Sequence, residues 1–157
     1  MPSISRCINI LSRASGMFRA ANVKNEELKP CLQSYILTLT RTPGLSQEQI
    51  ARRLCVDKSS VARALASLEK MGYVERRRHE TDRRITLVYP SEKAVDAREG
   101  IRSAYRAWNE YINEAFSEEE AKQFIELLEK AAERAAEYAQ QKLDSDGFSE
   151  DGGGEDK

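Results

Sequence analysis

Two short helices joined by a three-residue turn restrict this chain's fold more than any other feature. Ser46 begins the first helix with a capping box, because its hydroxyl and the side chain of Gln49 pair with free backbone amides. The turn 55–57 ends in Asp57, a favoured N-cap residue. The second helix has apolar residues at spacings of 0, 3, 4 and 7, namely Val61, Ala64, Leu65 and Leu68. Gly72 follows where helices commonly end. The pattern predicts a helix-turn-helix unit.

Two strand-like runs, Tyr73–Arg78 and Ile85–Tyr89, follow this unit. The polar loop between them ends in Arg83 and Arg84. This order predicts a winged helix-turn-helix with a two- to three-stranded antiparallel wing, in a mainly α (α+β) chain. In such units the second helix enters the DNA major groove. Arginines on a projecting loop suit the electronegative minor groove beside it.

Charge is balanced overall but uneven along the chain, with 25 Lys+Arg, 26 Asp+Glu and a net charge of −1. Residues 46–90 contain ten bases and six acids, a local net of +4. Residues 117–141 and 142–157 each have a net charge of −4. A basic centre between acidic ends indicates an anionic partner for the centre. A solvated charged face is the alternative.

The side-chain inventory argues against several other classes of function. The chain has one histidine, and its three cysteines form neither a CxxC pair nor a Cys/His cluster. Glycine-rich phosphate-binding motifs are absent as well. We therefore expect no enzyme, no metal and no cofactor. No apolar run of 18 residues occurs, and serines and arginines interrupt the first 20 residues, so we expect a cytoplasmic protein without a membrane segment.

The flanking segments are expected to be helical and to mediate dimerisation. Apolar periodicity and capping residues predict helices over 3–20 and 30–41, and two more beginning near 91 and 117. A small winged unit cannot cover all their apolar stripes, so we expect an obligate homodimer, with an intramolecular three-helix packing as the alternative. The expected division is N-terminal helices (1–41), winged helix-turn-helix (42–90), C-terminal dimerisation helices (91–143) and a disordered, acidic, Gly-rich tail (144–157).

A set of small, polar or basic residues is expected to contact DNA, with solvated charges as the alternative. Donors at the start of the second helix suit phosphate, and those further along suit base edges. The expected residues are Ser46, Lys58, Ser59, Ser60, Ala62, Arg63, Ser67, Arg78, Arg83 and Arg84. Asp82 is expected to orient a neighbouring arginine, since phosphate repels a free acid. His79 is expected to be an exposed loop residue. The arginines at 76–78 alternate along a strand, so only one or two are expected to contact DNA.

The segment Leu45–Ala94 closely resembles the MarR family of bacterial and archaeal transcriptional regulators. The matching stretches are 45–51, 56–61 and 68–76, followed by the wing sequence Asp82-Arg83-Arg84. The resemblance implies a homodimer with interlocked terminal helices. Each subunit would present a recognition helix and a wing to a pseudo-palindromic site in double-stranded DNA. The departures are Cys55 where the family usually has Gly or a small residue, and Ser91 and Ala94 where it often has Thr and Gly.

These observations predict a sequence-specific DNA-binding regulator, a repressor relieved by a small ligand of unknown identity. The resemblance places phenolic or lipophilic ligands in a crevice between the dimer helices and the winged domain. Tyr35, Tyr105 and Trp108 would line that crevice or, as we prefer, belong to the core. One alternative is a thiol-based redox regulator that uses Cys7, with Tyr35 as hydrogen-bond partner of its thiolate. The other is a winged-helix protein-interaction module that never contacts DNA.

Overall fold

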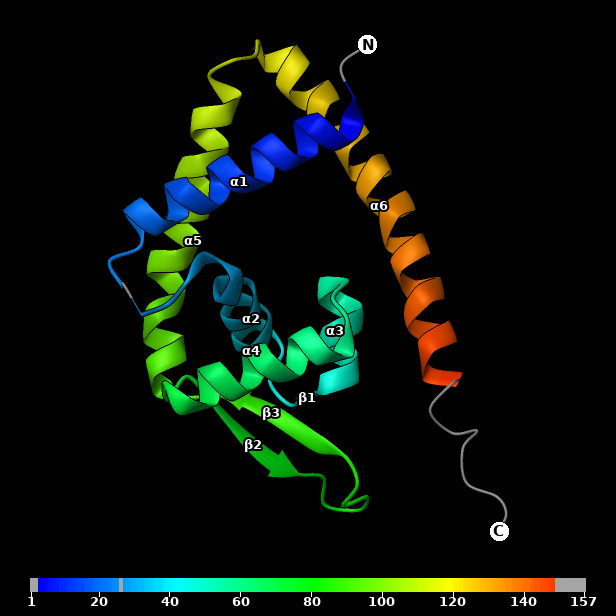
Figure 1. The fold of residues 1–157 in the computed structure, drawn as a ribbon. Coiled ribbons are helices and arrows are strands. Elements are labelled where there is room, and N and C mark those ends of the chain that lie inside the picture. Colours follow the sequence, from blue (N-terminus) through cyan, green and yellow to red (C-terminus); the bar gives the residue numbers. More distant parts are fainter. Residues whose placement is uncertain (1–2, 26, 149–157) are drawn as a thin grey trace.

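The structure is a computed structural model that describes residues 3–25 and 27–148 (Figure 1). Within these ranges a helical body carries a small antiparallel sheet. The elements in chain order are α1 (Ile4–Asn22), α2 (Pro30–Arg41), β1 (Leu45–Ser46), α3 (Gln47–Leu54), α4 (Lys58–Lys70), β2 (Val74–Arg78), β3 (Thr86–Pro90), α5 (Glu92–Asn113) and α6 (Glu118–Phe148). The mainly α fold with a wing is confirmed.

One hydrophobic core joins α2, α3, α4, the sheet and the N-terminal part of α5. Its most completely buried side chains include Ile36, Leu39, Ile50, Val61, Leu68, Tyr73 and Ile101. These side chains come from four helices and from the residue before β2, so burying them fixes α3 and α4 against α2 and α5. The core therefore sets the direction in which α4 presents its exposed face.

The helix-turn-helix forms as its capping residues predict. Ser46 Oγ accepts a hydrogen bond from the Gln49 amide at 3.2 Å, and Gln49 Oε1 accepts one from the Ser46 amide at 2.8 Å. Asp57 Oδ1 accepts one from the Ser60 amide at 2.8 Å. Cys55 adopts a left-handed conformation with φ of 52°. This left-handed conformation strains a residue that carries a side chain, so Gly would adopt it more readily than Cys55 does.

The wing is a three-stranded sheet in the order β1-β3-β2, within the described residues. Val88 of β3 pairs with Leu45 of β1 on one side and with Arg76 of β2 on the other. Both wing strands begin one residue later than expected. Tyr73 precedes β2 and is fully buried in the core, while Ile85 belongs to the turn at the wing tip.

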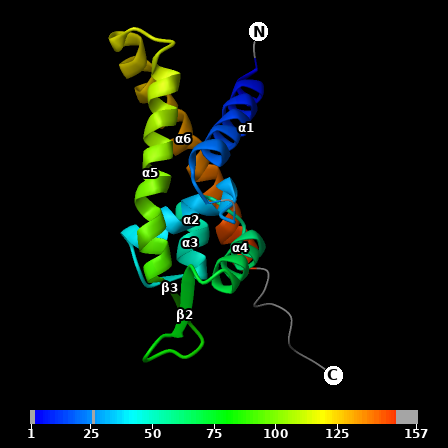
Figure 2. The same ribbon diagram turned by 90° about the vertical axis from the view of Figure 1, so that its left-hand side faces the viewer.

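The helices α1, α5 and α6 extend beyond the winged unit (Figures 1 and 2). Helix α5 extends away from the sheet, and α1 crosses α5. Helix α6 returns from the far end of α5 toward α3. Aromatic packing joins α1 to α5, with the ring centroids of Phe18 and Trp108 5.5 Å apart and those of Phe18 and Tyr111 6.0 Å apart.

The expected start of the disordered tail at Asp144 is wrong, because α6 continues to Phe148. Asp144 Oδ1 lies 2.7 Å from Arg52 Nη2, and this ion pair holds the end of α6 against α3. The acidic composition of this stretch is thus partly neutralised by a basic residue of the winged unit. Residues 149–157 of the expected tail lie outside the described residues. None of the described helices has an apolar stretch long enough to cross a membrane.

Candidate nucleic-acid interface

The exposed side of α4 carries hydroxyl, methyl and basic groups. Ser59, Arg63 and Ser67 are exposed, and Lys58, Ser60 and Ala62 are half-buried. The opposite side of the helix is buried in the core through Val61, Leu65 and Leu68. All six residues expected on the DNA-reading side of α4 therefore retain solvent access.

Ser60 links the N-cap of α4 to Arg63, an exposed base of the helix. Arg63 Nη2 donates a hydrogen bond to Ser60 Oγ at 2.9 Å. Hydrogen bonds from the hydroxyl and the amide of Ser60 lower the pKa of the Asp57 carboxyl, and the charge of Arg63 adds to this effect. The chain Asp57–Ser60–Arg63 thus holds a guanidinium along the helix surface while the cap remains ionised.

Ser46 serves first as a structural cap. It is half-buried, and its oxygen accepts the Gln49 amide, which leaves its hydroxyl hydrogen free to donate to another group. Helix α3 is also tied directly to α4, because Gln47 Nε2 donates to the carbonyl of Lys58 at 3.2 Å. The expected contact residues on the two helices therefore belong to one rigid unit.

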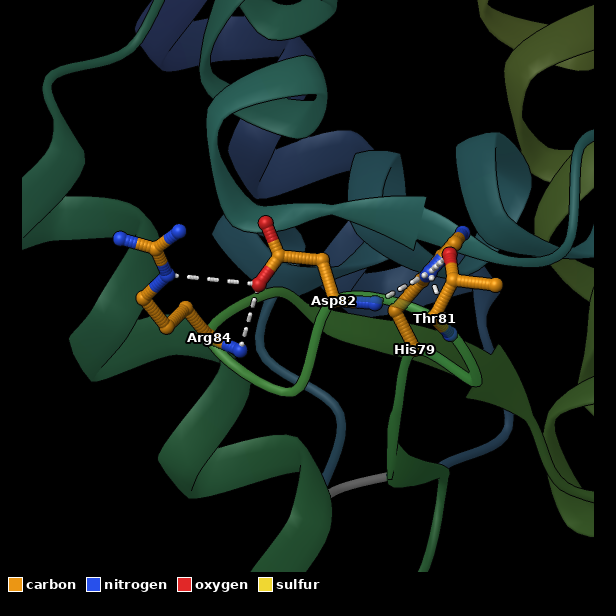
Figure 3. A network of polar contacts seen from close by, with 4 residues as sticks. All are labelled: His79, Thr81, Asp82 and Arg84. Carbon is orange, nitrogen blue, oxygen red and sulfur yellow. Dashed lines mark hydrogen bonds and ion pairs between the residues drawn. The ribbon is translucent and has the colours of Figure 1, made fainter.

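Polar contacts organise the wing tip (Figure 3). Asp82 Oδ1 accepts hydrogen bonds from the backbone amide of Arg84 at 3.0 Å and from its Nε at 3.4 Å. Asp82 is therefore in contact with the neighbouring Arg84. The side chain of Arg84 is 95% exposed, so its guanidinium projects from the wing. Asp82 holds only the backbone amide and the Nε of this arginine.

The expectation of an exposed His79 is wrong. This side chain is half-buried, and its Nδ1 accepts hydrogen bonds from the amides of Thr81 at 3.4 Å and Asp82 at 3.3 Å. The histidine closes the turn because its ring nitrogen accepts hydrogen bonds from the backbone amides two and three residues later. An Asp or Asn side chain closes an Asx turn in a similar way. The spacing His-x-Thr-Asp was the available signal for this role.

The three consecutive arginines of β2 have different surroundings. Arg76 Nε lies 3.1 Å from Glu69 Oε2. Arg77 pairs with Glu75 at 3.0 Å and lies over the ring of Tyr89. Arg78 is exposed, and its side chain makes no hydrogen bond or ion pair with another residue in the described ranges. Of the three, Arg78 is therefore the one with a guanidinium available for an external anion.

A pocket of about 460 Å³ separates α2 from α4. It is lined by Lys29, Cys31, Leu32, Ser34, Tyr35, Val56, Ser60, Arg63, Ala64 and Ser67. Burial raises the pKa of the Tyr35 hydroxyl, and the charges of Asp57 and Cys31 raise it further. Tyr35 therefore belongs both to the core and to the pocket wall. Trp108 packs on α1, and Tyr105 lies against the core beneath the guanidinium of Arg19.

The cysteines Cys7, Cys31 and Cys55 are free and exposed. The charge of Cys31 acts on Tyr35, and the pairing of Tyr35 with Cys7 stays a prediction. No group of three or more potential metal ligands occurs in the part of the chain that the structure describes.

Comparison with known proteins matches the model of the MarR family to residues 34–86. The HTH-type transcriptional regulator BilQ of Clostridium symbiosum is 29% identical over 114 residues, 73% of this chain and 79% of that protein. The uncharacterized HTH-type transcriptional regulator YdgJ of Bacillus subtilis is 31% identical over 125 residues, 76% of this chain and 74% of that protein.

Solved structures agree with these relatives. A MarR protein from Peptoclostridium difficile superposes with a TM-score of 0.83 at 25% identity, covering 90% of this chain and 93% of that one. Two structures of lower identity share the fold. One is a MarR family regulator from Listeria monocytogenes complexed with 26mer DNA (TM-score 0.80, 22% identity, 100% of both chains). The other is PcaV from Streptomyces coelicolor with its natural ligand (TM-score 0.76, 19% identity, 85% of this chain and 94% of that one).

Fold, site and relatives together define a DNA-binding winged-helix transcriptional regulator and not an enzyme. The chain belongs to the MarR family.

Proposed function

We propose that the protein is a homodimeric repressor that binds a pseudo-palindromic operator in the cytoplasm and is released by a small ligand. The observation that carries the proposal is the pairing of two surfaces. One is the α4 side with exposed Ser59, Arg63 and Ser67. The other is the wing tip, where Asp82 holds the base of the projecting Arg84. Both are presented by elements of one core, so they can engage adjacent grooves together.

Each residue of the interface has a proposed role. The donors at the N-terminus of α4, Lys58, Ser59 and Ser60, bind backbone phosphates, as does the free hydroxyl hydrogen of Ser46. Ala62, Arg63 and Ser67 face base edges in the major groove. Arg83 and Arg84 enter the minor groove, and Arg78 contacts the phosphates beside it. Phosphate contacts supply salt-dependent affinity, and the base contacts supply sequence preference.

Dimerisation is supported by the apolar side chains that α1 and α6 leave exposed. On α1 these include Ile4, Ile8 and Met17, and on α6 they include Leu127, Leu128 and Tyr138. Figure 1 shows α1 crossing α5 beyond the winged lobe and α6 running back from the far end of α5 toward α3. A second copy related by a twofold axis would cover them and place two copies of α4 on successive turns of DNA.

Ligand relief is supported by the pocket between α2 and α4. Its apolar wall and the hydroxyl of Tyr35 suit a small aromatic ligand, and the guanidinium of Arg63 at its edge suits an anionic group on that ligand. PcaV, of the same fold, was solved with its natural ligand. A ligand bound here would engage Arg63 and shift α4 relative to α2, so that the two halves of the dimer no longer match the operator.

Thiol-based sensing through Cys7 stays a prediction. Its thiol is exposed on α1, which oxidation requires. Loss of DNA binding on adding peroxide, abolished by Cys7→Ser, would make oxidation the releasing signal instead of a ligand.

The test is fluorescence-anisotropy binding to DNA upstream of the protein's own gene, measured across a salt series. We expect Arg63→Ala to weaken specific binding by about 5- to 150-fold, the range for loss of a base contact. Arg84→Ala should weaken it comparably. The matched control is Arg134→Ala, since Arg134 is also an exposed arginine beside an acid, Glu137, but lies on α6.

Equal binding of wild type and both interface variants, with no preference over random DNA on any upstream fragment, would contradict the proposal. That result would instead favour a protein-interaction module. A promoter-reporter assay in a strain lacking the protein gives the sign of regulation, and increased expression is the outcome expected of a repressor.

A further inference from the structure

Three arginines converge on a concavity between α2 and α5 that the proposed DNA and ligand contacts do not use. The concavity has a volume of about 400 Å³ and is lined by Leu37 and Arg41 of α2 and by Arg98 and Arg102 of α5. It shares no lining residue with the pocket between α2 and α4. The two helices pack directly against each other, and Figure 2 shows α2 alongside α5.

The three arginines form no ion pair within the described residues, although the charges of Arg98 and Arg102 act on the neighbouring Glu99. No hydrogen bond or ion pair joins the side chain of Arg41, Arg98 or Arg102 to any other residue in the ranges 3–25 and 27–148. Other bases near the core do pair with an acid, as Arg76 does with Glu69 and Lys93 with Glu27. Like charges gathered around one hollow repel each other, so the arrangement is stabilised when an anion lies between them.

Arg98 gives the most specific sign of a missing partner. Its Nε is buried in the wall of the concavity without a hydrogen-bond acceptor. A buried donor on a charged group is costly to leave unpaired. The neighbouring carboxylate of Glu99 pairs with Arg106 Nη2 at 2.7 Å, and Arg98 Nε has no hydrogen bond to it. The hydrogen bond from Arg106, with smaller contributions from the charges of Arg102 and Arg98, lowers the pKa of Glu99.

We propose that this arginine site binds a small oxyanion with at least two carboxylate or phosphoryl groups. Planar guanidinium groups pair with either kind of group through two parallel hydrogen bonds. Leu37 provides an apolar wall for the body of an organic anion, and the volume lies within the range of small-molecule sites. Because its lining comes from α2 and α5 together, the bound anion connects the winged core to the long helix.

Isothermal titration calorimetry on the full chain tests this proposal, with citrate as the carboxylate probe and pyrophosphate as the phosphoryl probe. Chloride at matched ionic strength provides the baseline. We expect saturable binding of at least one probe, weakened about tenfold or more by Arg98→Gln and by Arg102→Gln. The preferred probe then identifies which of the two groups the site recognises.

Two control variants, each of which also removes one positive charge, test whether the probe binds at the concavity. Arg84→Gln removes a basic group from the DNA-binding wing, and Arg134→Gln removes one from α6. Both should bind the probe within about twofold of wild type, within the spread usual for sites that do not touch the ligand. Arg41→Gln, at the exposed rim, repeats the test where no buried atom is disturbed, should Arg98→Gln unfold.

The proposal is overturned if neither citrate nor pyrophosphate binds. So does binding that Arg84→Gln abolishes and Arg98→Gln preserves, because the anion would then occupy the DNA-binding surface. The outcome is independent of operator recognition, which is measured separately with Arg63→Ala and Arg84→Ala.

Discussion

The charge of Asp82 and its hydrogen bonds to Arg84 are expected to have opposite effects on DNA binding. A carboxylate on a DNA-binding wing is expected to weaken binding by repelling phosphate. Here its Oδ1 holds both the amide and the Nε of Arg84, so the acid restricts the arginine to a few conformations. The restriction lowers the entropy lost when the guanidinium enters a groove.

Replacing Asp82 therefore distinguishes orientation from repulsion. We expect Asp82→Ala to weaken operator binding by about 2- to 10-fold, the equivalent of one hydrogen bond. Asp82→Asn, which keeps an oxygen acceptor but loses the charge, should weaken it less. Anisotropy titrations at one salt concentration compare the three proteins. Tighter binding by both variants would show that repulsion of phosphate is the dominant effect.

His79 shows where reasoning from single residues fell short. A lone histidine in a polar loop gives no strong sign of its role, because its ring nitrogen can face either solvent or the backbone. In the folded wing, Nδ1 lies within reach of the amides of Thr81 and Asp82. That geometry depends on the pairing of β2 with β3, which positions both ends of the loop.

At the scale of elements, helix ends were predictable wherever a cap is formed by residues close in sequence. Ser46, Asp57 and Ser117 each bond to the helix they precede, with partners three residues away. The strands were less predictable, because a strand begins where its neighbour allows pairing. Tyr73 reads as part of a strand but is buried beneath the sheet.

The N-cap of α4 makes the stability of the recognition helix depend on pH. Hydrogen bonds from Ser60 hold the pKa of Asp57 below its ordinary value of 3.8. The ionised cap therefore stabilises the fold fully above that value, and its contribution disappears as the pH falls through the lowered pKa. Asp57→Asn keeps a good N-cap but removes the titration.

We expect wild type to have the higher thermal midpoint at pH 7, and the difference from Asp57→Asn to close below about pH 3.8. Melting curves of both proteins, followed by circular dichroism from pH 7 to pH 3, measure this difference. A gap that stays constant over the range would mean that the charge of Asp57 does not stabilise the fold. Asp57→Ala should be less stable than both at pH 7, because it has no capping oxygen.

At the scale of the whole molecule, the exposed apolar surface of α6 supports the proposed dimer. Leu127 is 65% exposed and Tyr138 is 64% exposed, although both face the side of the helix on which its apolar residues recur. We expect the wild type to sediment as a dimer. Leu127→Glu should raise the dimer dissociation constant by about tenfold or more, since it places an unpaired charge in an apolar interface.

The control for this prediction is Gln123→Glu, which changes the net charge equally at an exposed polar position of α6. Sedimentation equilibrium over a range of protein concentrations measures both variants. A monomeric wild type would contradict the dimer and leave the intramolecular packing of α1, α5 and α6. Leu127→Glu should bind the operator more weakly, and its binding curve should rise less steeply with protein concentration, because one subunit reads only half of the site.

The sequence by itself determined the helix-turn-helix, the wing and the set of residues proposed to read DNA. These features depend on caps, periodicity and turns, whose interactions extend over only a few residues. The tertiary structure alone decided which charges are paired and which are not. Arg52 pairs with Asp144 of α6, whereas Arg41, Arg98 and Arg102 line one concavity and form no ion pair within the described residues. Such contacts depend on how helices pack around a shared core, because packing brings together side chains that lie far apart in the sequence.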